Sequence, residues 1–103
     1  MDNNSYMNNT PMNQQTAAEY PDGHKEFYLY GKLHRIDGPA VEYPDGHKAW
    51  FLNGKYHRED GPAIEHSNGS KEWWLNGKRH SQEEFREELE LIIAIDKQIQ
   101  ILE

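Results

Sequence analysis

The feature that most constrains the fold is an internal repeat of 23 residues. Residues 20–42 read YPDGHKEFYLYGKLHRIDGPAVE and residues 43–65 read YPDGHKAWFLNGKYHREDGPAIE, with 16 of 23 positions identical. A third copy, residues 66–80, ends early because Ser81-Gln82-Glu83-Glu84 replaces the Asp-Gly-Pro-Ala segment, and Ala17–Glu19 matches the end of a preceding unit. A repeat of this length predicts units that stack side by side over residues 17–80.

Each unit is predicted to form short β-strands joined by tight turns. Asn53-Gly54 and Asn76-Gly77 are favoured at the centre of two-residue hairpins, since both positions take positive φ, and Tyr30-Gly31 is the weaker equivalent in the first unit. The segments before these turns, residues 26–30, 49–53 and 72–76, are dense in aromatic residues, as strands are. The repeats therefore predict an antiparallel sheet of hairpins.

The segment 81–103 is predicted to form one long C-terminal helix. Ser81 and Glu84 have the spacing of a capping box, and neither Gly nor Pro follows. One apolar stripe runs along it, formed by Phe85, Leu89, Ile92, Ile95, Ile99 and Leu102. Because the repeat strands carry large apolar residues on both faces, we expect this helix to cover one face of the sheet. The predicted fold class is α+β, with residues 1–16 as a disordered arm.

Charge and composition narrow the class of partner. The net charge is −7, but residues 17–80 carry ten acids and nine bases, whereas residues 81–103 carry seven acids and two bases. Nucleic-acid and anionic-membrane binders usually carry a basic patch, so neither partner is expected. The chain has no cysteine, no long apolar run and no secretory signal pattern. These features predict a cytoplasmic protein.

The histidines invite a metal hypothesis that the repeat spacing opposes. His34, His57 and His80 share one column of the repeat, where neighbours are expected about 10 Å apart at roughly 4.8 Å per strand. Zinc binds its nitrogen ligands at about 2 Å, so one ion cannot bridge the column. The segments His34–Asp37 and His57–Asp60 are duplicated in register, which argues against catalysis and favours an Arg–Asp pair that holds each turn. We predict no enzyme activity, no metal and no cofactor.

The repeat resembles the MORN family. The run from Trp50 to His57, WFLNGKYH, has the family's aromatic strand, Asn-Gly-Lys hairpin and histidine, and Trp73 to His80 repeats it. The family usually places a glycine directly after the histidine, whereas here Arg58-Glu59-Asp60 precedes Gly61, a variant associated with small phage and bacterial proteins. The resemblance implies a stacked-hairpin sheet and a scaffold or binding role, with lipids and proteins as partners. The nearly neutral repeats weaken the lipid option.

These observations favour a non-enzymatic protein-binding module. The leading hypothesis is a small phage-encoded inhibitor that occludes a surface of a host defence complex, for instance a CRISPR effector, in the host cytoplasm. The alternative is a MORN-type scaffold or an antitoxin-like interaction protein. The candidate partner-binding residues are Trp50, Trp73, Trp74, Arg35, Arg58, Glu83, Glu84, Glu87 and Glu88. A homodimer is also predicted, with its interface at Leu91, Ile92, Ile95, Ile99 and Leu102.

Overall fold

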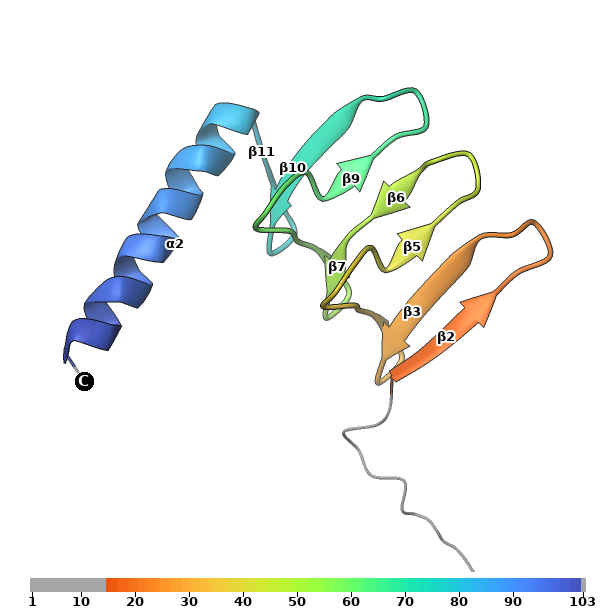
Figure 1. Ribbon diagram of the computed structural model, residues 1–103, viewed down its shortest axis with the longest axis horizontal. Helices are drawn as coiled ribbons and strands as arrows, with labels where there is room; N and C mark the ends of the chain where they lie inside the picture. The colour runs from red at the N-terminus through yellow and green to blue at the C-terminus, as the bar shows by residue number, and fades with distance from the viewer. Residues whose placement is uncertain (1–14, 103) are drawn as a thin grey trace, which may run out of the picture.

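The computed structural model describes residues 15–102, with side chains described for residues 15–98, and has an antiparallel sheet followed by one helix (Figure 1). The α+β fold class predicted from the sequence is confirmed. The elements are β2 (Gln15–Glu19), β3 (Lys25–Leu29), β4 (Lys32–Leu33), β5 (Val41–Glu42), β6 (Lys48–Ala49), β7 (Phe51–Leu52), β8 (Lys55–Tyr56), β9 (Ile64–Glu65), β10 (Lys71–Leu75), β11 (Lys78–His80) and α2 (Gln82–Leu102).

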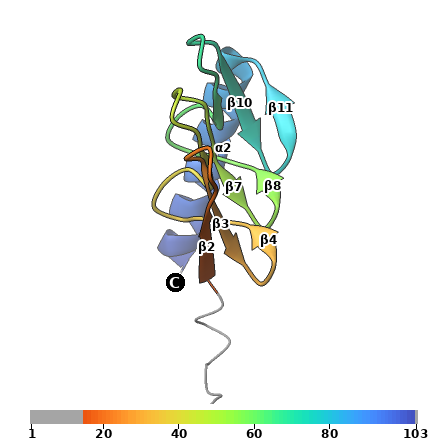
Figure 2. The ribbon, with the colours of Figure 1, turned by 90° about the vertical axis from the view of Figure 1, so that its right-hand side faces the viewer.

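The strand that leads into the hairpin is interrupted at Trp50 in the second unit, whereas β3 and β10 are continuous. In the second unit, the N–H of Trp50 donates to the carbonyl of Ala63 at 2.7 Å, while its carbonyl accepts from the N–H of His57 at 3.0 Å. Residues before Trp50 join the main sheet, whose order is β11-β10-β9-β6-β5-β3-β2, and β7 after it pairs with β8 in a separate two-stranded sheet. The three hairpin strands β4, β8 and β11 follow one another along one side of the molecule (Figure 2).

The hairpin turns have the geometry expected from the sequence. Asn53 and Gly54 have φ values of 52° and 80°, and Asn76 and Gly77 have 51° and 81°. Tyr30 adopts the same conformation, with a φ of 50°. A bulky side chain at positive φ is unusual, so the repeat geometry dictates this turn even where the local sequence favours it less.

Buried histidines join each unit to the next. The N–H of Asn53 donates to Nδ1 of His34 at 2.9 Å, and the N–H of Asn76 donates to Nδ1 of His57 at 2.9 Å. Because a backbone N–H can only donate, each imidazole must present an unprotonated Nδ1. The two imidazoles are buried, with 7% and 9% of their residue surface exposed. Each imidazole therefore supplies the hydrogen-bond acceptor for a backbone N–H at the hairpin turn of the following unit.

The apolar core is small, because the molecule is thin. Its shortest dimension is 17 Å. The buried apolar residues in the described part of the chain are Ala40, Val41, Ala49, Ala63, Ile64, Leu75 and Phe85. None of the described large side chains is fully buried. Polar contacts between units must therefore supplement hydrophobic burial.

The expectation that the helix covers a face of the sheet is wrong. Helix α2 lies beside the last hairpin at the end of the array (Figure 1), and its main contacts are with β10 and β11. Within the described part of α2 only Phe85 is buried. The physical reason is that the inner units cover their own aromatic residues with side chains from the sheet, as described below. At the other end, β2 begins at Gln15, inside the predicted arm of residues 1–16; residues 1–14 lie outside the described part.

The inter-unit histidine bond predicts an asymmetric effect of alanine substitutions. His57→Ala leaves the N–H of Asn76 without its acceptor, so we expect a loss of about 1–3 kcal/mol in the free energy of unfolding. His80 occupies the same position in the last unit, where no further hairpin follows and its Nδ1 lies 2.9 Å from the carbonyl of Lys78. His80→Ala should cost about 0.5 kcal/mol or less. Urea unfolding measures both values, and equal losses would contradict the role assigned to His57.

Candidate protein-interaction site

The two repeat arginines are used within the fold. The Cζ of Arg35 lies 3.9 Å from the ring centroid of Phe27, and that of Arg58 lies 3.8 Å from the ring of Trp50. Arg58 also binds Asp60 at 2.8 Å, which is the predicted Arg–Asp pair, and Nη1 reaches the carbonyl of Pro62 at 3.0 Å. Arg35 binds Asp37 and the carbonyl of Pro39 in the same way. Each guanidinium thus covers an aromatic ring and closes the following loop.

The glycine in the Asp-Gly-Pro-Ala segment makes room for the arginine. A Cβ on Gly61 would lie only 2.8 Å from the Cζ of Arg58. A side chain there would push the guanidinium off the ring of Trp50 or out of its hydrogen bonds. The Arg-x-Asp-Gly-Pro-Ala pattern of the repeat is therefore one packing unit, and it limits how far Arg35 and Arg58 can serve as partner contacts.

A surface groove of about 680 Å³ separates the two arginine loops. Trp50 and Leu52 line it together with Ile36, which is 85% exposed. Asp37, Glu59 and Asp60 add carboxylates to the lining. Trp50 therefore lies at an accessible groove, although one side of its ring is covered by Arg58.

The three tryptophans do not form one site. Trp73 lines a second groove of about 330 Å³, next to Ser81, which stands where the first two units have arginine. Trp74 follows it on the strand and points to the opposite face, because side chains alternate along a strand. Its indole N–H donates to Oε1 of Glu72 at 2.9 Å, and its ring packs 5.0 Å from that of Tyr56 against the core. Trp74 therefore has a structural role within the fold.

A ladder of aromatic rings along the turns was missed in the sequence. It runs through Tyr20, His24, Tyr43, His47 and His66, with centroid distances of 4.3, 4.6, 5.4 and 5.5 Å between successive rings. The signal was present, since each unit begins with Tyr or His and the first two carry His at the fifth position. The ladder begins on the side of the sheet that carries Glu26, because the hydroxyl of Tyr20 donates to its carboxylate.

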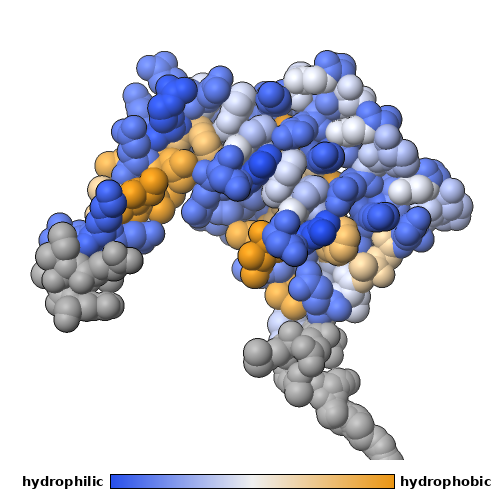
Figure 3. Space-filling view, viewed as in Figure 1, coloured by the Kyte–Doolittle hydropathy of each residue, from blue (hydrophilic) through white to orange (hydrophobic). Residues whose placement is uncertain are grey.

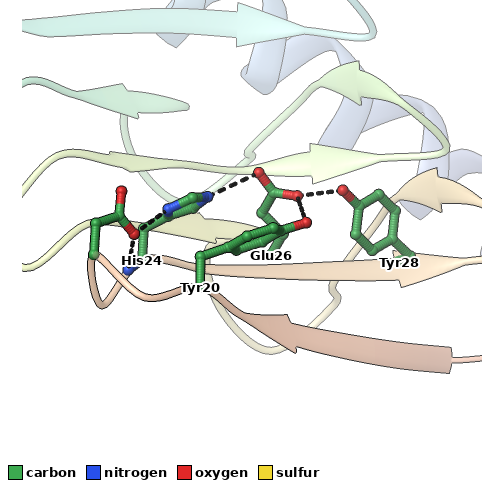
Figure 4. Close-up of polar contacts among 5 residues, drawn as sticks. Tyr20, His24, Glu26 and Tyr28 are labelled. Carbon is green, nitrogen blue, oxygen red and sulfur yellow. Dashed lines mark hydrogen bonds and ion pairs between the residues drawn. The ribbon is translucent and has the colours of Figure 1, made fainter.

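Glu26 lies at the centre of a polar cluster at the start of this ladder (Figure 4). Its carboxylate accepts hydrogen bonds from the hydroxyls of Tyr20 and Tyr28 and contacts Nε2 of His24 at 3.2 Å. The Tyr28 bond is the main cause that lowers the pKa of Glu26. Nδ1 of His24 lies 2.6 Å from Asp22, and this bond is the main cause that raises the pKa of His24. Since both oxygens of Glu26 have donors, the cluster suits a structural role.

Helix α2 begins with the capping box expected from the sequence. The N–H of Ser81 donates to Oε1 of Glu84 at 3.0 Å, and the N–H of Glu84 donates to Oγ of Ser81 at 3.1 Å. The first of these bonds is the main cause that lowers the pKa of Glu84. Glu83, Glu87 and Glu88 are exposed. The first turns of the helix thus present carboxylates to solvent.

The exposed side of α2 combines these acids with apolar residues. Leu91 and Ile95 are each 59% exposed and lie one turn apart. At 100° per residue they share a side with Glu84, Glu87 and Glu88, and we call this set of five residues the α2 outer face. Ile92, predicted at an interface, is half-buried on the side that carries Phe85, whereas Ile93 is 46% exposed. The side chains of Ile99 and Leu102 lie outside the described residues. Figure 3 shows hydrophobic surface along this helix.

Comparison with protein-family models, with curated proteins and with solved structures finds no match to this chain. The resemblance to the MORN family therefore stays a prediction. Among the described residues, no group of three or more His, Cys, Asp or Glu side chains is placed to hold a metal ion. No helix in the described part of the chain is both long and apolar enough to span a membrane.

The His24 contacts predict a pH-dependent contribution to stability. The pKa of His24 is raised in the folded state, so its contribution is fully present below its unfolded pKa and is lost as the pH rises through the folded pKa. The free energy of unfolding lost on His24→Gln should therefore be larger at pH 6 than at pH 9. Asp22→Asn, which removes the main cause of the shift, should reduce this difference. Denaturant unfolding at both pH values measures it, and a loss that is independent of pH would contradict the assignment.

Proposed function

We propose that this chain is a non-enzymatic protein-binding module whose α2 outer face enters a groove on a partner protein. The observation that carries the proposal is the exposure of Leu91 and Ile95, two aliphatic side chains one turn apart on a helix that projects from the end of the sheet. Helices that bind in grooves use apolar anchors at this spacing. An exposed apolar strip on a helix is also a common mark of an interface.

The charge of α2 supports a partner with a basic groove. Over residues 82–98 the helix carries six acids and two bases. Glu84, Glu87 and Glu88 precede the apolar pair on the same side. Carboxylates around an apolar anchor steer association toward basic surfaces and disfavour acidic ones. The fitting partner therefore has an apolar groove flanked by lysine or arginine.

Within this class, we favour a phage-encoded inhibitor of a host defence complex, acting in the host cytoplasm. Effectors such as CRISPR complexes hold nucleic acid in positively charged channels. An acidic helix with an apolar anchor suits such a channel, and a protein of 103 residues blocks access by bulk alone. The alternative is a MORN-type scaffold or an antitoxin-like module, supported by the open stack of hairpins, which offers extended surfaces.

The homodimer expected from the sequence would use part of the same face. A second copy would pair its Leu91 and Ile95 with those of the first, so the partner and the second copy compete for one surface. Sedimentation of the purified chain separates the two occupants. A dimer that Ile95→Asp dissociates would assign the face to a second copy.

The partner-binding role predicts the effect of charged substitutions on the helix. Leu91→Asp combined with Ile95→Asp should abolish capture of the partner, because an apolar groove cannot solvate two carboxylates. Affinity purification from the native host, followed by mass spectrometry, identifies the partner, and titration calorimetry then measures a loss of at least about tenfold in affinity. Ile36→Asp is the matched control, since Ile36 is 85% exposed but lies in a repeat loop. Equal loss in the control, or none in the helix variant, would contradict the proposal.

A further inference from the structure

The two ends of the sheet differ in the described structure. At one end α2 lies beside β10 and β11. At the other end, within residues 15–102, β2 pairs only with β3 and is the terminal strand of the sheet. Its counterparts β5 and β9 are paired on both sides. The outer edge of β2 therefore lacks, among the described residues, the neighbour that every equivalent strand has.

The exposure of residues in β2, compared with their equivalents in the complete units, also indicates a missing neighbour. Ala40 and Ala63, which directly precede β5 and β9, are 0% exposed, whereas the equivalent Ala17 is exposed. Val41 and Ile64 are buried, but the equivalent Ala18 is only half-buried. A further strand beside β2 would thus bury Ala17 and Ala18, whose equivalents are buried in both complete units.

The backbone groups that point outward can be assigned from the register. The N–H of Phe27 donates to Ala40, away from β2, so the residues of β3 that bond to β2 are Glu26 and Tyr28. Their partners Ala18 and Thr16 point inward, because antiparallel strands alternate their bonding residues. The N–H and C=O groups of Ala17 and Glu19 therefore point outward, ready to pair with another strand.

A row of alternating charges across the sheet indicates which side chains a strand beside β2 should carry. Pairing across the sheet places Glu19, Lys25, Glu42, Lys48, Glu65 and Lys71 side by side. Glu42 and Glu65 each have a lysine on both sides, and their carboxylates also bind Arg35 and Arg58 at 2.9 and 3.3 Å. Among the described residues, Glu19 has Lys25 as its one neighbour in this row. Two positions after the lysine, the first two units place an aromatic residue whose N–H donates to the carbonyl of the alanine directly before β5 or β9, at 2.8 Å for Phe27 and 2.7 Å for Trp50.

From these observations we infer that the outer edge of β2 is a second interaction surface, which binds an extended segment of a partner protein with the pattern lysine–any residue–aromatic. The segment runs antiparallel to β2, with its lysine opposite Glu19 and its aromatic residue opposite Ala17. The backbone ladder supplies affinity, and the two side chains supply selectivity. This surface lies apart from the α2 outer face, so either proposal can fail without the other.

A peptide titration tests the inference on the full chain. The probe is a synthetic peptide with the sequence of residues 71–75, KEWWL, and its control carries Glu in place of Lys. Amide resonances of residues 15–19 should shift on addition of the probe, and the control should bind about fivefold more weakly. Glu19→Lys should reverse this preference. Glu90→Lys makes the same charge change on α2 and should leave it unaltered.

A backbone variant checks the mode of binding. Ala17→Pro removes an outward N–H from an edge strand, where proline is tolerated, and should abolish the shifts while the protein stays folded. Absence of shifts at residues 15–19 in the parent chain would overturn the inference. A preference that Glu19→Lys does not reverse would overturn it as well. Self-association that Ala17→Pro abolishes would assign the edge to a second copy instead.

Discussion

The hydrogen bond from the hairpin of one unit to the buried histidine of the unit before it is the contact on which the stack depends. It fixes two things at once: the unprotonated Nδ1 of the imidazole and the position of the next turn. Backbone bonds beside it, from Gly54 to Leu33 and from Gly77 to Tyr56, each at 2.8 Å, hold the same junction. A buried polar group is costly without a partner, so each unit is complete only when its successor is in place.

This dependence explains how a single layer can carry aromatic residues on both faces. On one face the guanidinium groups of Arg35 and Arg58 cover the rings of Phe27 and Trp50. On the other face the ring of Tyr56 packs between those of Phe51 and Trp74, with centroid distances of 4.4 and 5.0 Å. The cover comes from within the sheet, so the helix is free to close the end of the array and to present its outer side. In the part of the chain that the structure describes, β2 has one neighbouring strand where β5 and β9 have two.

The repeat, the hairpins and the helix were predictable because local signals specify them. Asn-Gly turns require positive φ, and Ser81 with Glu84 satisfies the backbone donors that open a helix. The position of the helix was not predictable, since it depends on where Phe85 finds apolar cover after the last strand. The ring ladder was missed because it joins residues of neighbouring units, such as His24 and Tyr43. The sequence placed Leu91 and Ile95 at a predicted dimer interface and Arg58 and Trp74 at a predicted partner site, but it could not show that Arg58 and Trp74 are held within the fold.

Amide hydrogen exchange tests most directly whether neighbouring units are locked together through the buried histidines. The amides of Asn53 and Asn76 lie at exposed turn tips, where exchange is normally fast. If each donates to the imidazole of the preceding unit, both amides will be protected to a degree close to that of Trp50, inside the sheet. Exchange of Asn53 and Asn76 as fast as that of Asn68, in a turn without such a bond, would contradict the account.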